Sequence, residues 1–178
     1  MSSYIRLRRP GGRFFFTVAL ADRRSRLLVE RIDDLRAAYG AVAAARPFRT
    51  EAIVVMPDHL HAVWSLPDGD TDYSTRWGAI KAGFTMSLRR AGFSPPTDLP
   101  VVRSGRYAGL KPGLRVDRRE RGVWQRRFWE HTIRDEIDFA GCVQYCHFNP
   151  VKHGEVERPE NWPYSSIHRE IREGRWVA

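Results

Sequence analysis

Two runs rich in β-forming residues are separated by only two residues, Pro57 and Asp58. The runs cover residues 48–56 (FRTEAIVVM) and 59–66 (HLHAVWSL). Parallel strands need a long crossover connection, and two residues cannot provide one. The two runs are therefore predicted to pair as an antiparallel hairpin, and this pairing constrains where the other elements can lie.

The residues before this hairpin predict one strand and one helix. Residues 12–20 follow Pro10-Gly11 and are rich in β-formers, which favours a strand. Residues 22–28 form a polar connection. Residues 32–45 have apolar side chains at helical spacing, and Arg46-Pro47 ends the pattern.

The residues after the hairpin begin with a loop over 67–71 and a second helix. Ser74 or Thr75 is the expected cap of this helix, which extends to about Arg90. Residues 91–121 are rich in Gly, Pro and Arg and have no clear periodicity. We interpret the stretch from about 92 to 121 as a basic insertion or loop.

The last third of the chain predicts a fourth strand over 123–133 and a helix from Glu136 to about Phe148, capped by Asp135 and stopped by Pro150. The first six elements follow the order β-α-β-β-α-β, which is typical of ferredoxin-like folds. We therefore expect an α+β fold with an antiparallel sheet and helices on one face. A C-terminal tail follows from about 155 to 178, with a short charged helix reaching Arg175.

Composition is consistent with one domain over residues 1–178, because 42% of the residues are hydrophobic and can form a substantial core. No stretch approaches the roughly 20 apolar residues needed to cross a bilayer, and the charged start lacks the apolar run of a signal peptide. Cys142 and Cys146 are the only cysteines. We interpret them as buried thiols rather than a disulfide or metal ligands, and expect a cytoplasmic protein.

The chain is strongly basic, with a formal charge of +9 and 27 Arg against 3 Lys. Most of the positive excess lies in residues 103–134, which together carry a net charge of +7. Arginine forms bidentate contacts with phosphate and stacks on bases, so the cluster favours a nucleic-acid partner. A solvated charged surface is the alternative explanation.

Two short motifs carry candidate chemistry. His59 and His61 are two apart in a predicted strand, and Tyr145 and Asn149 are four apart in a predicted helix. Each pair therefore shares one face of its element. Two imidazoles and a side-chain amide are suitable ligands for a divalent ion. The phenol of Tyr145 is then a candidate nucleophile toward a phosphate that the ion polarises.

Each of these residues also has a purely structural explanation. The two histidines can be polar residues on a solvated sheet face, and Tyr145 can pack at a helix edge. Asn149 precedes Pro150, and both residue types favour helix ends. His131, in the predicted fourth strand, either supports the site from behind its ligands or is structural.

Aromatic and basic residues alternate in the segment WQRRFW, residues 124–129. Trp124 is a candidate for stacking on unpaired bases, and Arg126 and Arg127 for binding the backbone. Arg118 and Arg119 in the basic stretch are further candidates. An edge strand with its aromatic side chains in the core is the alternative, and we expect some of these rings to be buried.

Taken together, the motifs resemble those of the REP-associated tyrosine transposases, which belong to the HUH single-tyrosine transposases. The resemblance extends over most of the chain from Phe48 to Ser166. It is carried by VVMPDHLHAVW (54–64), WQRRFWEHTIRD (124–135), QYCHFNPVKHG (144–154) and NWPYSS (161–166).

This resemblance implies a metal-dependent endonuclease and strand transferase for single-stranded DNA, acting on palindromic repeat hairpins through a covalent 5′-phosphotyrosine. It places the nucleophile at Tyr145 and the metal ligands at His59, His61 and Asn149. The implied metal is Mg²⁺ or Mn²⁺. The implied partner is single-stranded or hairpin DNA, bound by a monomer or homodimer in the bacterial cytoplasm and at the nucleoid.

Two other functions remain open at this point. A protein derived from such a transposase can bind DNA hairpins without cutting them, in which case loss of His59 or His61 would be tolerated. An RNA-acting endonuclease is the third possibility.

Overall fold

The computed structural model describes residues 10–93 and 122–176, and it contains the predicted hairpin. Strands β2 (Arg49–Val55) and β3 (His59–Ser65) are antiparallel, with Val54 opposite His61 and Val55 opposite Leu60. The backbone N–H of Met56 donates to the carbonyl of His59 at 2.8 Å and closes the turn.

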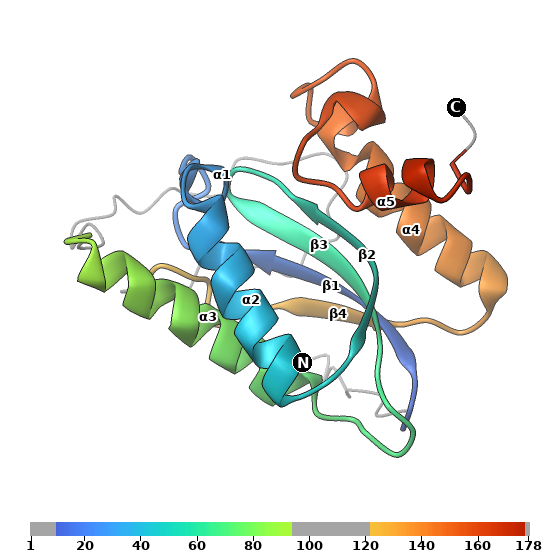
Figure 1. The fold of residues 1–178 in the computed structure, drawn as a ribbon, viewed down its shortest axis with the longest axis horizontal. Helices are drawn as coiled ribbons and strands as arrows, with labels where there is room; N and C mark the ends of the chain where they lie inside the picture. The colour runs from blue at the N-terminus through green and yellow to red at the C-terminus, as the bar shows by residue number, and fades with distance from the viewer. Residues whose placement is uncertain (1–9, 94–121, 177–178) are drawn as a thin grey trace, which may run out of the picture.

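The sheet has four strands in the order β2-β3-β1-β4, and all neighbours are antiparallel (Figure 1). Strand β1 (Arg13–Ala19) is central, and β4 (Trp129–Thr132) forms one edge. This is the ferredoxin-like arrangement that the order of elements predicted, so the α+β fold class is confirmed.

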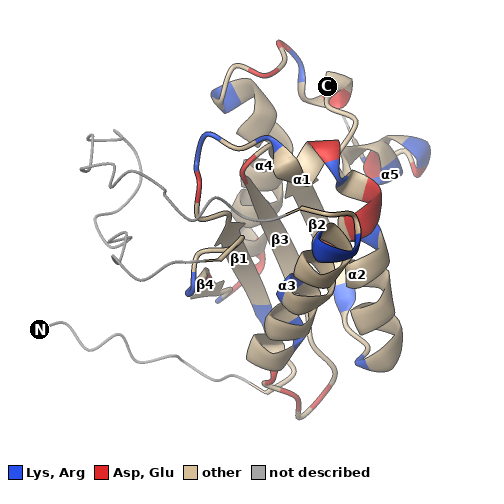
Figure 2. Cartoon of the chain, turned by 90° about the vertical axis from the view of Figure 1, so that its left-hand side faces the viewer, with Lys and Arg blue, Asp and Glu red and all other residues tan. Residues whose placement is uncertain are grey.

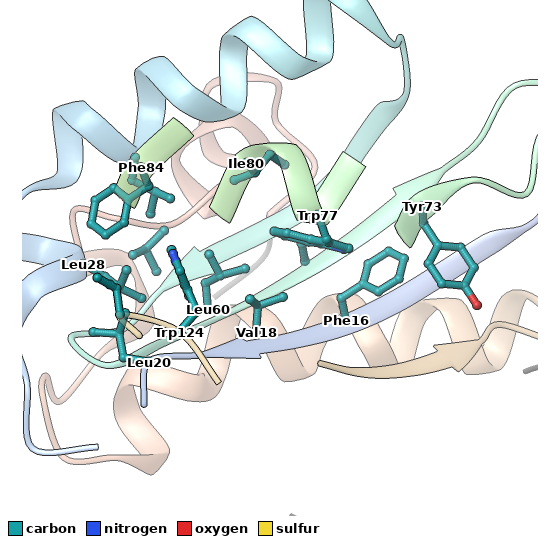
Figure 3. Packing of buried hydrophobic residues seen from close by; sticks show 14 of the residues in the cluster. Phe16, Val18, Leu20, Leu28, Leu60, Tyr73, Trp77, Ile80, Phe84 and Trp124 are labelled. Carbon is teal, nitrogen blue, oxygen red and sulfur yellow. The ribbon is translucent and has the colours of Figure 1, made fainter. Parts of the chain in front are cut away.

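Helices α2 (Ile32–Ala45) and α3 (Tyr73–Arg90) pack side by side on one face of the sheet, as predicted. Figure 3 shows Phe16 and Val18 of β1 and Leu60 of β3 packed in one cluster with Trp77, Ile80 and Phe84 of α3. A further four-residue helix, α1 (Leu27–Glu30), lies partly within the segment predicted as a polar connection. It forms because Leu27 and Leu28 are buried in the same core.

Helix α4 (Glu136–Lys152) packs against the opposite face, mainly on β2 and β3 (Figure 1). A second core lies there, where Phe15 and Val63 of the sheet meet Cys146 of α4. Alternate residues of β1 thus enter different cores, since side chains in a strand alternate between its faces. Both cysteines are free thiols, and Cys146 is buried.

The predicted end of α4 at about Phe148 is wrong, because the helix continues through Pro150 to Lys152. Proline lacks one backbone N–H, and near the last turn this costs only one helical hydrogen bond. Gly154 follows with a φ of +71°, the left-handed conformation that commonly terminates a helix. Asn149 therefore lies within the helix rather than at its end.

Two other predicted boundaries are also corrected. Helix α3 is capped by Asp72 rather than by Ser74 or Thr75. The carboxylate of Asp72 accepts a hydrogen bond from the backbone N–H of Thr75 at 3.0 Å. The fourth strand begins at Trp129 rather than residue 123, although Trp124 forms an isolated bridge with Leu20. Trp129 pairs with Thr17. From the Trp124 bridge to this pair the segment advances five residues while β1 advances three, so the extra residues have no partners in the ladder.

The C-terminal segment runs along the free edge of β2. The N–H of Val55 donates to Tyr164 and the N–H of Ser166 donates to Ile53, both at 2.8 Å. The indole of Trp162 donates to the carbonyl of Val55 at 2.9 Å. The NWPYSS motif thus covers a strand edge that would otherwise be available for aggregation. The tail also contains a 3₁₀ turn, η1 (Pro159–Asn161), and helix α5 (Ile167–Arg172).

Charged residues lie mainly on helices, loops and strand ends, and most of the sheet carries none (Figure 2). Among the described residues, no helix has both the length and the apolar character needed to cross a membrane. The basic insertion lies mostly outside the described residues, and so do Arg118 and Arg119.

Candidate active site

The histidine pair lies on the face of β3 that α4 covers. In the antiparallel register, Thr17 of β1 is opposite His61 and Ala19 is opposite His59. Leu60, between the histidines, enters the other core. Only 4% of His59 and 2% of His61 is exposed, so neither is a polar residue on a solvated sheet face.

Each imidazole is oriented through its Nδ1 atom. The Nδ1 of His61 lies 2.9 Å from the hydroxyl of Thr17, and the Nδ1 of His59 lies 2.6 Å from Asp58. Arg23 holds the same carboxylate at 2.8 Å. An ionised carboxylate only accepts, so the short contact to Asp58 favours a proton on Nδ1 of His59 and leaves Nε2 as the nitrogen that would bind a metal. This is the outer-shell arrangement that commonly prepares a histidine to bind metal.

Tyr145 and Asn149 are four apart on one face of α4, and His153, the C-cap residue, follows four residues later on the same side. The Tyr145 ring lies edge-on to His61, with centroids 5.1 Å apart, and His153 lies 5.2 Å from His59. Asn149 lies between Tyr145 and His153 on this face. The structure thus brings Tyr145 and both histidines together, and Asn149 belongs to the helix face that covers them.

Two side chains at this place have buried polar atoms without protein partners. These are Nε2 of His61 and both amide atoms of Asn149, which is only 1% exposed. Burying an unpaired polar group typically costs about 1–3 kcal/mol. A bound ligand would satisfy such groups, and two imidazoles with one amide oxygen form a donor set that fits a divalent metal ion.

Burial and nearby positive charges favour the neutral form of the His61 and His153 imidazoles. Burial, followed by the nearby charges of His59 and His153, holds the pKa of His61 well below its ordinary value. Burial and His59 also lower the pKa of His153. Burial opposes ionisation of Asp58, yet its hydrogen bond to His59 and the nearby positive charges keep its pKa low. His61 is therefore neutral at neutral pH, the form that binds metal.

The candidate nucleophile is partly exposed and has a cation beside it. The Tyr145 ring packs edge-on against Phe15, with centroids 5.6 Å apart. The ammonium of Lys152, one residue from His153 and exposed, lies 5.0 Å from the centre of the Tyr145 ring. A phosphate entering at the phenol would therefore meet positive charge.

Comparison with known proteins identifies the family. No family model matches the chain. The "REP-associated tyrosine transposase" of Escherichia coli K12 is 40% identical over 174 residues, which cover 98% of this chain and 87% of that protein. The "Putative REP-associated tyrosine transposase" of Haemophilus influenzae is also 40% identical, over 97% of this chain and 89% of that protein. This chain belongs to the REP-associated tyrosine transposases.

A solved structure of a REP-associated tyrosine transposase supports the same fold. It is described as bound to a REP hairpin, and it superposes with a TM-score of 0.79 at 38% identity. The match covers 99% of this chain and 89% of that chain.

In this member of the family, His131 lies apart from the histidine pair. Its Nε2 lies 2.9 Å from Asp138, which also receives a hydrogen bond from Arg134. His131, Asp138 and Cys142 present nitrogen, oxygen and sulfur atoms within 4.8 Å of one another. Burial, followed by the charge of Asp138, raises the pKa of the Cys142 thiol to about 11, so at neutral pH this sulfur is protonated and a poor ligand.

Trp124 is not available as a stacking platform in this structure. It is 9% exposed, packs edge-on against Phe84 at 5.4 Å, and donates from its indole to the carbonyl of Lys81 at 3.2 Å. Arg126 and Arg127 are exposed on the segment before β4.

Sequence reasoning missed Thr17, Asp58 and Lys152. Asp58 had a visible signal, since it directly precedes His59. Thr17 had none, because its contact with His61 depends on the register between β1 and β3.

Proposed function

We propose that this chain is a metal-dependent endonuclease and strand transferase for single-stranded DNA, acting beside palindromic repeat hairpins. The edge-on contact between Tyr145 and His61 carries the proposal, because it puts a nucleophile beside a candidate metal ligand. The names of the relatives and the REP hairpin in the related structure support the choice of substrate.

His59, His61 and Asn149 would hold the ion, either Mg²⁺ or Mn²⁺. When bound there, the ion polarises a phosphate oxygen and makes the phosphorus more electrophilic. The buried and unpaired atoms of His61 and Asn149 support this assignment.

Tyr145 would attack the scissile phosphorus through its phenol oxygen. The new bond joins that oxygen to phosphorus, and the bond from phosphorus to the 3′ oxygen breaks. The phenol proton is lost, and the departing 3′ oxygen gains one. The products are a 5′-phosphotyrosine and a free 3′-hydroxyl. A DNA hydroxyl can reverse or redirect this step without a nucleotide cofactor, since the phosphodiester is exchanged rather than hydrolysed.

The chain's cations would hold the DNA during this step. Lys152 would contact the phosphate beside Tyr145, where its ammonium already lies. Arg126 and Arg127 would bind the backbone nearby, and the basic stretch that includes Arg118 and Arg119 would contribute charge that attracts the polyanion.

The direct test uses a labelled single-stranded oligonucleotide that contains a repeat hairpin and its flank. With Mn²⁺ or Mg²⁺, the wild-type protein should form a covalent adduct that survives a denaturing gel. Tyr145→Phe should form no adduct but should bind the hairpin almost as tightly. Tyr164→Phe is the matched control, because Tyr164 lies along β2 and packs on Trp162. An adduct that persists in Tyr145→Phe would overturn the assignment.

Two further measurements separate this proposal from its alternatives. A hairpin-binding protein that does not cut would give a shifted complex in native gels but no adduct with either ion. An RNA-acting endonuclease would prefer RNA hairpins in competition at a stated salt concentration, because affinity depends steeply on salt.

A further inference from the structure

An exposed tryptophan lies on the same sheet face as the candidate active site. Trp129 of β4 pairs with Thr17 of β1, and Thr17 pairs with His61 of β3. Opposed residues point to the same face of an antiparallel sheet, so the three form one row across it. Neighbouring strands lie about 4.8 Å apart, which places Trp129 roughly 10 Å from His61.

Phe15 connects this tryptophan to the nucleophile. Its ring is edge-on to Trp129 at 5.7 Å and edge-on to Tyr145 at 5.6 Å. Trp129 and Tyr145 therefore flank the same phenyl ring. A strand of DNA whose phosphate reaches Tyr145 can therefore extend across Phe15 to the indole.

The indole is held in place on its other side. His131 stacks on Trp129 with ring centroids 6.0 Å apart and planes only 6° apart. Asp138 fixes His131 through a contact of 2.9 Å. The position of Trp129 is thus supported by its neighbours, although 41% of the side chain is exposed. An exposed indole in a fixed orientation suits a planar ligand.

We infer that Trp129 is the stacking platform for the unpaired base next to the scissile phosphate. This inference rests on the proposed function and specifies how the single-stranded flank is held. Stacking on an aromatic ring is sequence-tolerant, because every base has a π-face. Trp129 would therefore set the position of the base rather than its identity.

The experiment uses full-length protein with Tyr145→Phe, so that cleavage does not interfere with binding. Three DNA hairpins are compared by fluorescence anisotropy: one with its single-stranded flank, one with an abasic residue at the unpaired position beside the cleavage site, and one without a flank. Trp129→Ala should weaken binding of the flanked hairpin about tenfold. It should leave the other two almost unchanged, and Trp129→Phe should restore most of the loss.

Phe148→Ala is the matched control. Phe148 is also 41% exposed, but it lies beside Trp176 at 5.8 Å. It should not alter any of the three affinities. As a second readout, 2-aminopurine at the unpaired position should be quenched on binding and regain its fluorescence in Trp129→Ala.

The outcomes separate this inference from the proposed function. If the Tyr145→Phe protein binds none of the hairpins, both fail. If it binds them, and Trp129→Ala does not reduce affinity for the flanked hairpin, or reduces all three equally, only the stacking role is overturned. Loss of a protein dimer with unchanged DNA affinity would assign the indole to a protein interface instead.

Discussion

The ring of Tyr145 meets the ring of His61 edge-on, with centroids 5.1 Å apart and planes at 82°. The two residues are far apart in sequence and come from a helix and a strand. Their contact puts a phenol directly beside an imidazole whose Nε2 has no protein partner.

Divalent ions should stabilise the folded protein. A ligand at 100 times its Kd adds about 2.7 kcal/mol to the free energy of unfolding. Thermal denaturation with Mn²⁺ or with chelator should show this gain in the wild type and not in His61→Ala. His168→Gln is the control, because His168 contacts the carbonyl of Trp162 and should keep the gain. An equal gain in His61→Ala would exclude His61 as a ligand.

Asn149→Leu should stabilise the protein in chelator while abolishing ion binding. Leucine has a similar volume and removes two buried polar atoms that lack partners. We expect about 1–3 kcal/mol more free energy of unfolding, measured by urea denaturation in EDTA. Asn161→Leu, at an exposed position in η1, should change little. A marked loss of stability in Asn149→Leu would show that the amide serves the fold.

Lys152→Gln should slow adduct formation about tenfold or more, while Lys152→Arg should retain most of the rate. Its ammonium lies 5.0 Å from the Tyr145 ring centre, and under the proposed function the scissile phosphate would bind at the same phenol. The slope of log K for DNA binding against log salt concentration should become less steep by about 0.7, the value for one phosphate contact on a single strand. Arg36→Gln is the control, because Arg36 is in α2 on the other face of the sheet and is paired with Asp33. Equal rates in Lys152→Gln and wild type would remove Lys152 from the site.

His147 should make the protein less stable in acid. Burial lowers its pKa from 6.5 to about 4; the charge of Glu170 opposes this shift, and the charge of Arg169 adds to it. Between these values the unfolded chain takes up a proton that the folded chain does not. Stability should therefore fall as the pH drops from 6.5 toward 4, by up to about 1.4 kcal/mol per pH unit for this group.

His147→Gln should reduce the fall in the free energy of unfolding between pH 6.5 and 4. Above pH 6.5 the free energy of unfolding should depend on pH as it does in the wild type. Glutamine can still reach the hydroxyl of Ser166, which lies 3.3 Å from the imidazole. Urea denaturation at half-unit pH steps provides the measurement. Parallel curves for the variant and the wild type would show that His147 titrates alike in both states.

Much of the fold could be predicted from the chain because the signals are local. The two-residue connection at Pro57 and Asp58 imposes an antiparallel hairpin, and alternation in β3 puts His59 and His61 on one face with Leu60 on the other. Spacing along α4 likewise puts Tyr145 and Asn149 on one face. These relationships follow from the periods of strand and helix, which any short segment carries by itself.

Other features were decided only when distant segments packed together. The face of the sheet that α4 covers, and hence the meeting of Tyr145 with His61, depends on the second core around Phe15 and Cys146. Trp124 is buried and Trp129 exposed, although both lie in one aromatic and basic segment, because the pairing with β1 breaks between them. Burial and strand register depend on contacts between residues far apart in sequence. A local pattern could therefore indicate that these residues matter, but it could not predict which of them are buried or which residues they contact.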